Sequence, residues 1–186
     1  MFNNKFEWFT GVVEDRNDPL MMSRVRVRCL GIHTADKSAL PTEDLPWATV
    51  MMPTTSSGMT GLQESHHGLV KGSWVVGFFR DGEDMQDPMV MGSLSSMSTA
   101  ASNGAIGFND PSGEYPKENL INQPDVHSFA RGVDTPEGLV NSKKASVTKS
   151  VPTAKGTNWS EPETKFAPVY PFNHVHQSES GHVSEI

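Results

Sequence analysis

The 186-residue sequence has only one cysteine, Cys29, and no apolar run of 18 residues or more. A single cysteine excludes a disulfide within the chain, which is typical of proteins that assemble in a reducing cytoplasm. The lack of a long apolar run excludes a membrane-spanning helix. The opening residues MFNNKFEWF also lack the charged and then apolar layout of a secretory signal. We therefore expect assembly in the cytoplasm and no transmembrane segment.

Apolar residues and positive charge are both in short supply. Hydrophobic residues make up 35% of the chain, which also has 16 glycines and 13 prolines. This composition favours one compact part joined to a long extended part over a single globule. The formal net charge is −7, which argues against nucleic acid or an anionic membrane as the partner of the whole chain.

The first half of the sequence reads as short strands separated by turns, with no long helical period. The expected strands cover residues 8–14, 24–30, 47–52, 73–79 and 88–94. Gly11 and Gly77 lie inside two of these strands, where glycine is typical of a bulge or a sharp bend. One helical turn is expected over residues 42–45, and a long excursion over 53–72. Five short, bent strands predict a small Greek-key barrel.

The stretch RVRVRCL (24–30) has the strongest period-2 pattern in the chain. It predicts that Val25, Val27 and Cys29 face the core and that Arg24, Arg26 and Arg28 face outward. An arginine row could hold the phosphates of a single-stranded nucleic acid, but base stacking would also need exposed aromatic rings. Core or barrel-end packing explains most of the aromatic residues here, which are Trp8, Phe9, Trp47, Trp74, Phe78 and Phe79. We therefore expect an outer face paired with carboxylates or facing a partner protein, with nucleic-acid binding as the alternative.

The histidines raise the question of a metal site. They include the neighbours His66 and His67, then His174, His176 and His182. His174 and His176 would share one face of a strand, as zinc ligands can. Cys29 is far away in sequence, however, so no familiar metal-ligand spacing is completed. We expect no metal site within one chain, and a site between chains near a symmetry axis stays open.

No catalytic or cofactor-binding motif stands out. Turn chemistry already accounts for the carboxylates that a glycosidase would need as a pair, among them Asp15, Asp18, Asp81, Asp84 and Asp87. The sequence has neither a glycine-rich phosphate loop of the usual pattern nor a G-x-S-x-G elbow. We expect no catalytic residue and no cofactor.

Beyond residue 95 the chain loses any sustained period. Residues 132–168 are rich in Ser, Thr, Lys, Pro and Gly and predict an extended linker. Apolar anchors return singly, at Phe129, Trp159, Phe166, Tyr170 and Phe172. Such spacing cannot build a core, but it suits a strap across another surface. The last ten residues, QSESGHVSEI, read as the opening of a strand.

Several motifs, in one order, resemble a known family. They are GVVEDRNDPLMMSRVRVRCLGIH, LPTEDLPWATVMMP, GSWVVGFFRDGEDMQDPMVMGS and GFNDPSGEYP. Over roughly residues 8–116 the chain is similar to the N-terminal oligonucleotide/oligosaccharide-binding (OB) barrel of the baseplate central spike proteins of contractile-tailed, T-even-like bacteriophages. Spike proteins of type VI secretion are more distant relatives. Residues 159–186 resemble the segment that leads into the triple-stranded β-helix of the needle.

The resemblance implies an all-β protein: a five-stranded OB-fold Greek-key barrel, a long extended linker and the start of a β-helix strand. The expected parts are the barrel (1–95), an extended post-barrel segment (96–131), the linker (132–168) and the lead-in to the trimeric β-helix needle (169–186). It also implies a homotrimer in the virion's tail baseplate. The barrel would dock on the trimeric hub protein at the tail-tube end, and the C-terminal part would join a needle or tip protein. In this family the barrel docks protein and does not read nucleic acid.

The lysozyme domain of related spike proteins is expected to be absent, so the chain is not expected to be an enzyme. Only about 40 residues separate the barrel from the needle lead-in, and a domain with a cleft needs about 100. Those lysozymes place an aspartate about nine residues after the catalytic glutamate. From Glu114, Glu118 and Glu137 that offset reaches Gln123, His127 and Ser146. A peptidoglycan hydrolase is thus an alternative without a catalytic pair.

The sequence stops at Ile186, where a needle strand is expected to begin. Truncation, processing and a needle supplied by another polypeptide are three interpretations that the sequence leaves open.

Overall fold

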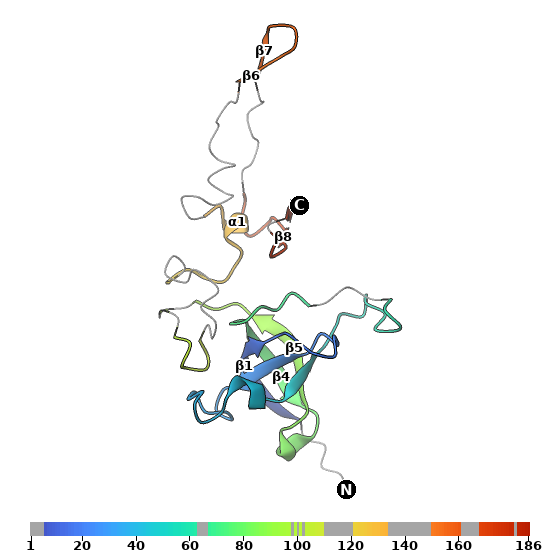
Figure 1. Ribbon diagram of the computed structural model, residues 1–186, viewed down its shortest axis with the longest axis vertical. Helices are drawn as coiled ribbons and strands as arrows, with labels where there is room; N and C mark the ends of the chain where they lie inside the picture. The colour runs from blue at the N-terminus through green and yellow to red at the C-terminus, as the bar shows by residue number, and fades with distance from the viewer. Residues whose placement is uncertain are drawn as a thin grey trace. The chain divides into compact units, whose positions relative to one another are not determined.

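The computed structural model describes residues 6–62, 67–97, 99, 101, 103–109, 121–133, 150–160, 168–180 and 182–186 (Figure 1). The chain forms two compact units, Met1–Pro124 and Asp125–Ile186. The predicted boundaries at residues 95, 131 and 168 stay predictions.

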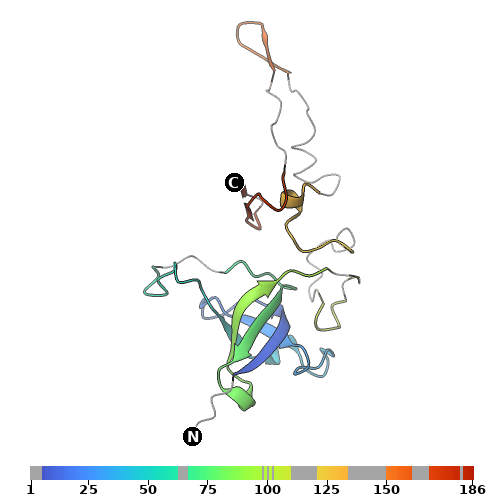
Figure 2. The same cartoon turned by 180° about the vertical axis from the view of Figure 1, so that it is seen from behind.

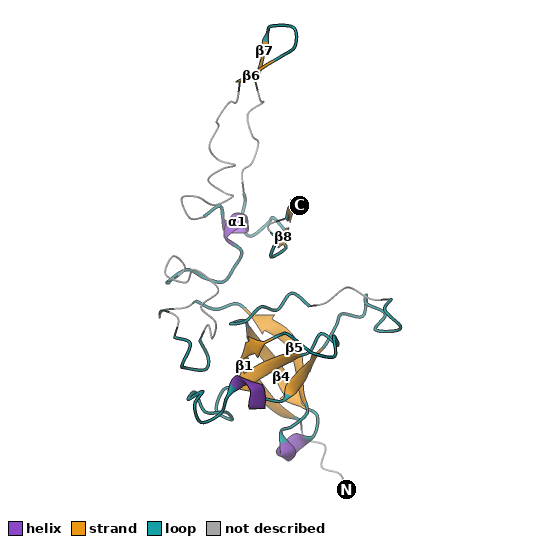
Figure 3. Cartoon of the chain, in the orientation of Figure 1, coloured by secondary structure: helices purple, strands orange, loops and turns teal. Residues whose placement is uncertain are grey.

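The first unit is built on a closed barrel in which each strand has two neighbours, in the order β1-β2-β3-β5-β4. The strands are β1 (Glu7–Asp15), β2 (Val25–Cys29), β3 (Trp47–Val50), β4 (Trp74–Phe79) and β5 (Pro88–Leu94). All pairs are antiparallel except β3 with β5, which is parallel. Figure 3 shows the strands of the barrel in orange. The prediction of a five-stranded Greek-key barrel is confirmed, and closure leaves no open sheet edge.

Alternate residues of each strand fill the barrel. The buried cluster comprises Phe9, Val13, Val25, Val27, Cys29, Ala48, Leu69, Val75, Phe79 and Val90. The rings of Phe9 and Phe79 pack with centroids 5.0 Å apart. Val25, Val27 and Cys29 lie inside, as the alternation in 24–30 predicts.

Two glycines allow close approach between strands. At Gly77 the β4–β5 register shifts, and a Cβ there would overlap the carbonyl oxygen of Met89, so the predicted bend at Gly77 is confirmed. The predicted bulge at Gly11 is wrong in position, because the β1–β2 register shifts between Val13 and Asp15. Gly11 pairs with Cys29 in register. Its role is to allow close approach of the strands, because a Cβ at that position would lie 2.5 Å from the Arg28 carbonyl oxygen.

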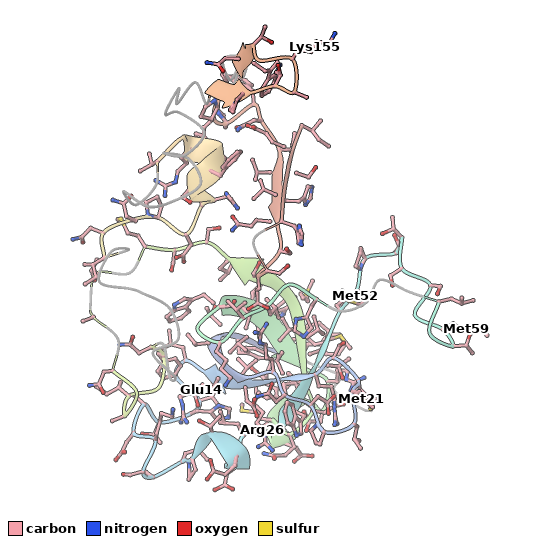
Figure 4. All side chains as sticks on the ribbon, turned by 45° about the horizontal axis from the view of Figure 1, so that its top comes forward. Glu14, Met21, Arg26, Met52, Met59 and Lys155 are labelled. Atoms are coloured by element: carbon pink, nitrogen blue, oxygen red, sulfur yellow. The ribbon has the colours of Figure 1, made fainter. Side chains whose placement is uncertain are left out.

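The loops of the first unit hold two short 3-10 helices, η1 (Thr42–Asp44) and η2 (Gly82–Asp84). The expected helical turn at residues 42–45 corresponds to η1. Between β3 and β4, the described residues form only turns, as expected for the excursion at 53–72. Figure 4 shows Met59 on the part of this loop that projects from the barrel.

The second unit contains small elements. They are α1 (Ser128–Arg131), β6 (Ser150–Pro152), β7 (Asn158–Ser160), β8 (Val175–Gln177) and β9 (Val183–Glu185). β6 pairs with β7 and β8 with β9, each antiparallel. The sequence predicted extended chain over residues 96–131 and an extended linker over 132–168. The first prediction missed α1, and the second missed the β6–β7 hairpin. The strand expected within 177–186 is present in part as β9.

Candidate docking surface

Arg28 is buried, so the prediction that it faces outward as part of an exposed row is wrong. It has no exposed surface, and its partner Glu14 is also buried. Arg28 Nε donates to Glu14 Oε1 (2.6 Å) and Arg28 Nη2 to Glu14 Oε2 (3.1 Å). Arg28 Nη1 donates to the carbonyl oxygen of Thr34 (2.6 Å) and Nη2 also donates to that of Leu40 (2.7 Å). A buried guanidinium needs such acceptors, because an unpaired charge is costly in the interior.

A later segment of the chain, residues 103–109, covers this ion pair. A Cβ on Gly107 would overlap the Arg28 side chain and lie 3.1 Å from Glu14 Oε1. The Gly107 N–H donates to the carbonyl of Ala35 (2.7 Å), and the ring of Phe108 stacks on Trp74 with centroids 6.4 Å apart. The covering segment explains why alternation alone gave the wrong environment for Arg28.

Arg24 pairs with Asp18, which organises the loop between β1 and β2. Arg24 Nη2 donates to Asp18 Oδ1 (2.7 Å), and its Nε to Asp18 Oδ2 (2.9 Å). The backbone N–H groups of Leu20 and Met22 also donate to the Asp18 carboxylate, both at 3.0 Å. The Arg24 guanidinium, with these N–H groups, holds the pKa of Asp18 well below its ordinary value.

Arg26 is engaged with the segment around η1. Its Nη1 donates to the carbonyl oxygens of Glu43 and of Leu45, the latter at 2.7 Å. Its guanidinium also lies 4.5 Å from the ring centroid of Trp47, within cation–π range. Figure 4 labels Arg26 and Glu14 on the barrel. Arg24, Arg26 and Arg28 therefore bind groups of their own chain, which favours the prediction of a face paired with carboxylates over a row for phosphates.

Among the described residues, no three His, Cys, Asp or Glu side chains lie where they could hold a metal ion. His176 and His182 line an open depression on the β8–β9 hairpin, and His67 accepts from the N–H of Leu69 (3.1 Å). Asp81 accepts from the N–H groups of Gln86 and Asp87, which is the turn role expected for it. His66 lies outside the described residues, as do Glu114, Glu118 and Glu137, the glutamates for which the sequence offers no catalytic partner.

Cys29 is buried in the barrel, and burial raises the pKa of its thiol to about 12. His33 accepts from the Cys29 N–H through Nδ1 (2.9 Å). Burial, helped by the nearby Arg28 charge, lowers the pKa of His33. Both residues therefore act as neutral packing groups near neutral pH.

Trp8 is an exception to the interpretation that core or barrel-end packing explains most of the aromatic residues. Trp8 is 60% exposed, and Phe6 beside it is 48% exposed. Both rings contact Phe78, with centroids 5.4 and 4.8 Å away. Trp8 and Phe9 are neighbours in β1, so their side chains point to opposite faces of the sheet, and the sequence alone could have shown this. The width of the uncovered face, in contrast, depends on the strand order.

Of the apolar anchors predicted in the second unit, Phe129 is buried and the other described ones are exposed. Ala130, which follows Phe129 in α1, is also buried. The exposed apolar side chains are Val133, Trp159, Val169, Tyr170, Phe172 and Ile186, and Phe172 is the second most exposed of them at 81%. Phe166 lies outside the described residues. Most of the large apolar side chains described in the second unit therefore face water, and of these exposed side chains only Trp159 lies on a strand.

Among the described residues, no helix has the length and the apolar character needed to cross a bilayer.

Comparison with known proteins places this barrel in a family. The family model for the Gp5 N-terminal OB domain matches residues 31–168. The chain is 38% identical to "Protein Gp5" of Vibrio phage KVP40 over 212 aligned positions, which cover 97% of this chain and 50% of that protein. It is 41% identical over 133 positions to "Pre-baseplate central spike protein Gp5" of Enterobacteria phage T4, covering 66% of this chain and 23% of that protein.

The chain therefore spans half or less of the length of these curated relatives. The resemblance to central spike proteins of contractile-tailed phages is confirmed. With a closed five-stranded barrel and a family model that matches most of its length, the chain belongs to the Gp5 N-terminal OB domain family.

Proposed function

We propose that this chain is the base of a phage tail spike, a structural component of the virion's baseplate that assembles in the host cytoplasm. It acts as a homotrimer, docks on the trimeric hub protein at the tail-tube end and connects the hub to the membrane-piercing needle. The similarity to the T4 relative, which is named a pre-baseplate central spike protein, supports this role.

The observation that carries the proposal is the second unit, whose described helix and strands are only three or four residues long and which exposes large apolar side chains, most of them outside these elements. Such short hairpins are marginal in water by themselves. Three copies wound together would bury Trp159, Tyr170 and Phe172 against one another, as obligate interfaces do. The mechanism is mechanical, because the trimer passes axial force from the hub to the tip when the sheath contracts.

The mass of the native complex tests the proposal. The purified full chain is expected to have the mass of three copies, or to reach it when the hub protein of the same phage is added. A stable monomer that ignores the hub protein at micromolar concentrations would overturn the proposal.

A cell-wall hydrolase is the first alternative, and we propose that this chain lacks that activity. Asp18 and Glu14 among the described carboxylates are bound to arginines, whereas glycoside hydrolysis requires a pair of carboxyl groups that flank the scissile bond. The clearing of a suspension of permeabilised bacteria measures this activity, and no clearing above buffer is expected. Lysis that scales with protein concentration would reinstate the hydrolase.

Single-strand binding is the second alternative, and the arginine geometry speaks against it. Arg24, Arg26 and Arg28 already donate to their own chain, so a phosphate would have to displace those acceptors. Oligonucleotide titration at low salt is expected to show no binding, whereas a strongly salt-dependent affinity would support this alternative.

A further inference from the structure

The outer side of β1, β4 and β5 is apolar apart from Thr10, although outward positions of a barrel are ordinarily polar. Figure 2 shows these three strands side by side. The strand register aligns their outward residues into rows across the strands. The rows are Trp8–Phe78–Met89, then Thr10–Val76 with Met91 at the β4–β5 register shift, and then Val12–Trp74–Leu94. None of these positions carries a charge.

One end of this face is covered by the chain itself. Val12 is fully buried, and Phe108 of the covering segment stacks on Trp74. The other end, which we call the Trp8 face (Phe6, Trp8, Phe78, Met89 and Met91), has no such cover among the described residues. Trp8 and Met91 are 60% and 43% exposed. Leu94 at the covered end is itself 43% exposed, so the cover lies over Val12 and Trp74, and the Trp8 face has no equivalent.

The Trp8 face has the size and composition of a docking surface. With about 200 Å² for each large side chain, Phe6, Trp8 and Met91 alone expose about 300 Å², the size at which an apolar patch on a monomer is often functional. Tryptophan and methionine are enriched in interface cores, and tryptophan dominates binding hot spots. The ring contacts of Phe78 with Phe6 and Trp8 hold these side chains in place before any partner arrives.

We infer that the Trp8 face is where the barrel docks on the hub protein, one barrel to one hub subunit. This inference rests on the proposed function. A ring of barrels around a threefold axis would need two different complementary surfaces on each barrel, whereas docking on a hub subunit needs one. The barrel presents one continuous apolar sheet face. Because that face is uncharged, its partner surface must be apolar at the centre, with aliphatic or aromatic side chains.

Methionine oxidation in the full chain tests the inference, because methionines lie both inside and outside the Trp8 face. Met91 is inside it, and Met21, which is 91% exposed in the β1–β2 loop, is the control. A brief peroxide exposure converts accessible methionine to the sulfoxide, and mass spectrometry measures each site. With saturating hub protein of the same phage, oxidation of Met91 should fall severalfold while that of Met21 stays unchanged.

Matched substitutions provide the second measurement. Trp8→Glu and Met91→Glu should each raise the Kd for the hub protein by about 30-fold or more, as expected for residues at the centre of an interface. Met21→Glu places the same charge on a more exposed methionine and should leave the Kd unchanged. Far-UV circular dichroism checks that each variant is folded, and Met91→Glu decides the matter if Trp8→Glu does not fold.

The outcomes separate this inference from the proposed function. A wild-type complex in which Met91 is oxidised as fast as in the free chain would overturn the Trp8 face and leave the spike role standing. Protection of Met91 in the chain alone would also overturn the inference. Protection that is independent of protein concentration would show that the chain's own residues cover the Trp8 face, and protection that rises with concentration would show that a sister copy covers it. If the wild-type chain forms no complex with the hub protein, the proposed docking itself fails.

Discussion

At the scale of single residues, Arg28 shows how a charged side chain can belong to the interior of the first unit. A carboxylate and two carbonyl oxygens accept four hydrogen bonds from the guanidinium of Arg28. Thr42 Oγ1 also donates to Glu14 Oε2 (2.8 Å). Such a buried pair contributes little net stability, but removing one partner leaves the other charge uncompensated.

We therefore expect Arg28→Met to destabilise the first unit by about 3–5 kcal/mol. The loss comes from the Glu14 carboxylate, which would remain buried without a counter-charge. Urea unfolding of the full chain, followed by tryptophan fluorescence, measures the change. The control is Arg80→Met, which removes the half-exposed Arg80–Asp87 pair and should cost less than about 1 kcal/mol. Equal effects of the two substitutions would contradict the burial of Arg28.

Asp18 gives stability a defined dependence on pH. Its pKa in the folded chain lies below the ordinary value of 3.8, so the folded state favours the carboxylate. The stabilisation is complete above the unfolded pKa of about 4 and is lost as the pH falls toward the folded pKa. The stability gap between wild type and Asp18→Asn should therefore be constant above about pH 5 and narrow below about pH 4. A gap that widens in acid, measured by urea midpoints, would contradict this assignment.

At the scale of elements, the strands end where the sequence predicts because turn residues bound each apolar run. The bend between β4 and β5 depends on Gly77, where the strands approach too closely for a side chain. Gly92 lies on β5 and pairs with Val76 of β4, yet a Cβ on Gly92 would meet nothing within 4 Å.

These two glycines form a matched pair for mutation. Gly77→Ala should destabilise the barrel by more than about 2 kcal/mol, because the new methyl group would overlap the Met89 carbonyl and press on Phe9. Gly92→Ala should change stability by less than about 1 kcal/mol. The midpoint of thermal unfolding measures both, and similar values would show that the β4–β5 approach is less tight than described.

Sequence reasoning works for these elements where the information is local. The alternation in 24–30 predicts that Val25, Val27 and Cys29 face inward, and Pro88 starts β5 because proline cannot donate within the sheet. It fails for Arg28, because the segment that covers it lies near Gly107, far along the chain. The β6–β7 hairpin was missed because SVP and NWS have no alternation, and the bulge near Glu14 has no glycine to mark it. The Trp8 face likewise depends on strand order, which brings β1, β4 and β5 together.

At the scale of the whole molecule, each unit has a different balance between core and surface. The barrel has a closed core of ten residues, whereas in the second unit Phe129 and Ala130 are the buried apolar side chains among the residues described. A unit with so few buried apolar side chains is marginal in stability by itself. The proposed homotrimer would cover the exposed ones.

Phe172→Ser should therefore weaken the proposed trimer, because the substitution removes an exposed aromatic ring that the trimer would bury. Sedimentation velocity over a dilution series should show dissociation at a higher concentration than for wild type. The barrel, monitored by its unfolding midpoint, should be unaffected. Met21→Ser removes an even more exposed apolar side chain from the first unit and should leave assembly unchanged. If both variants assemble like wild type, the second unit does not hold the trimer together.

The covering segment at residues 103–109 also changes the route by which tension enters the barrel. A chain that left directly from the end of β5 would peel that strand away one hydrogen bond at a time. Here a pull from beyond residue 109 first loads the backbone bond between Gly107 and Ala35 and the stacking of Phe108 on Trp74. β5 is therefore shielded until those contacts break.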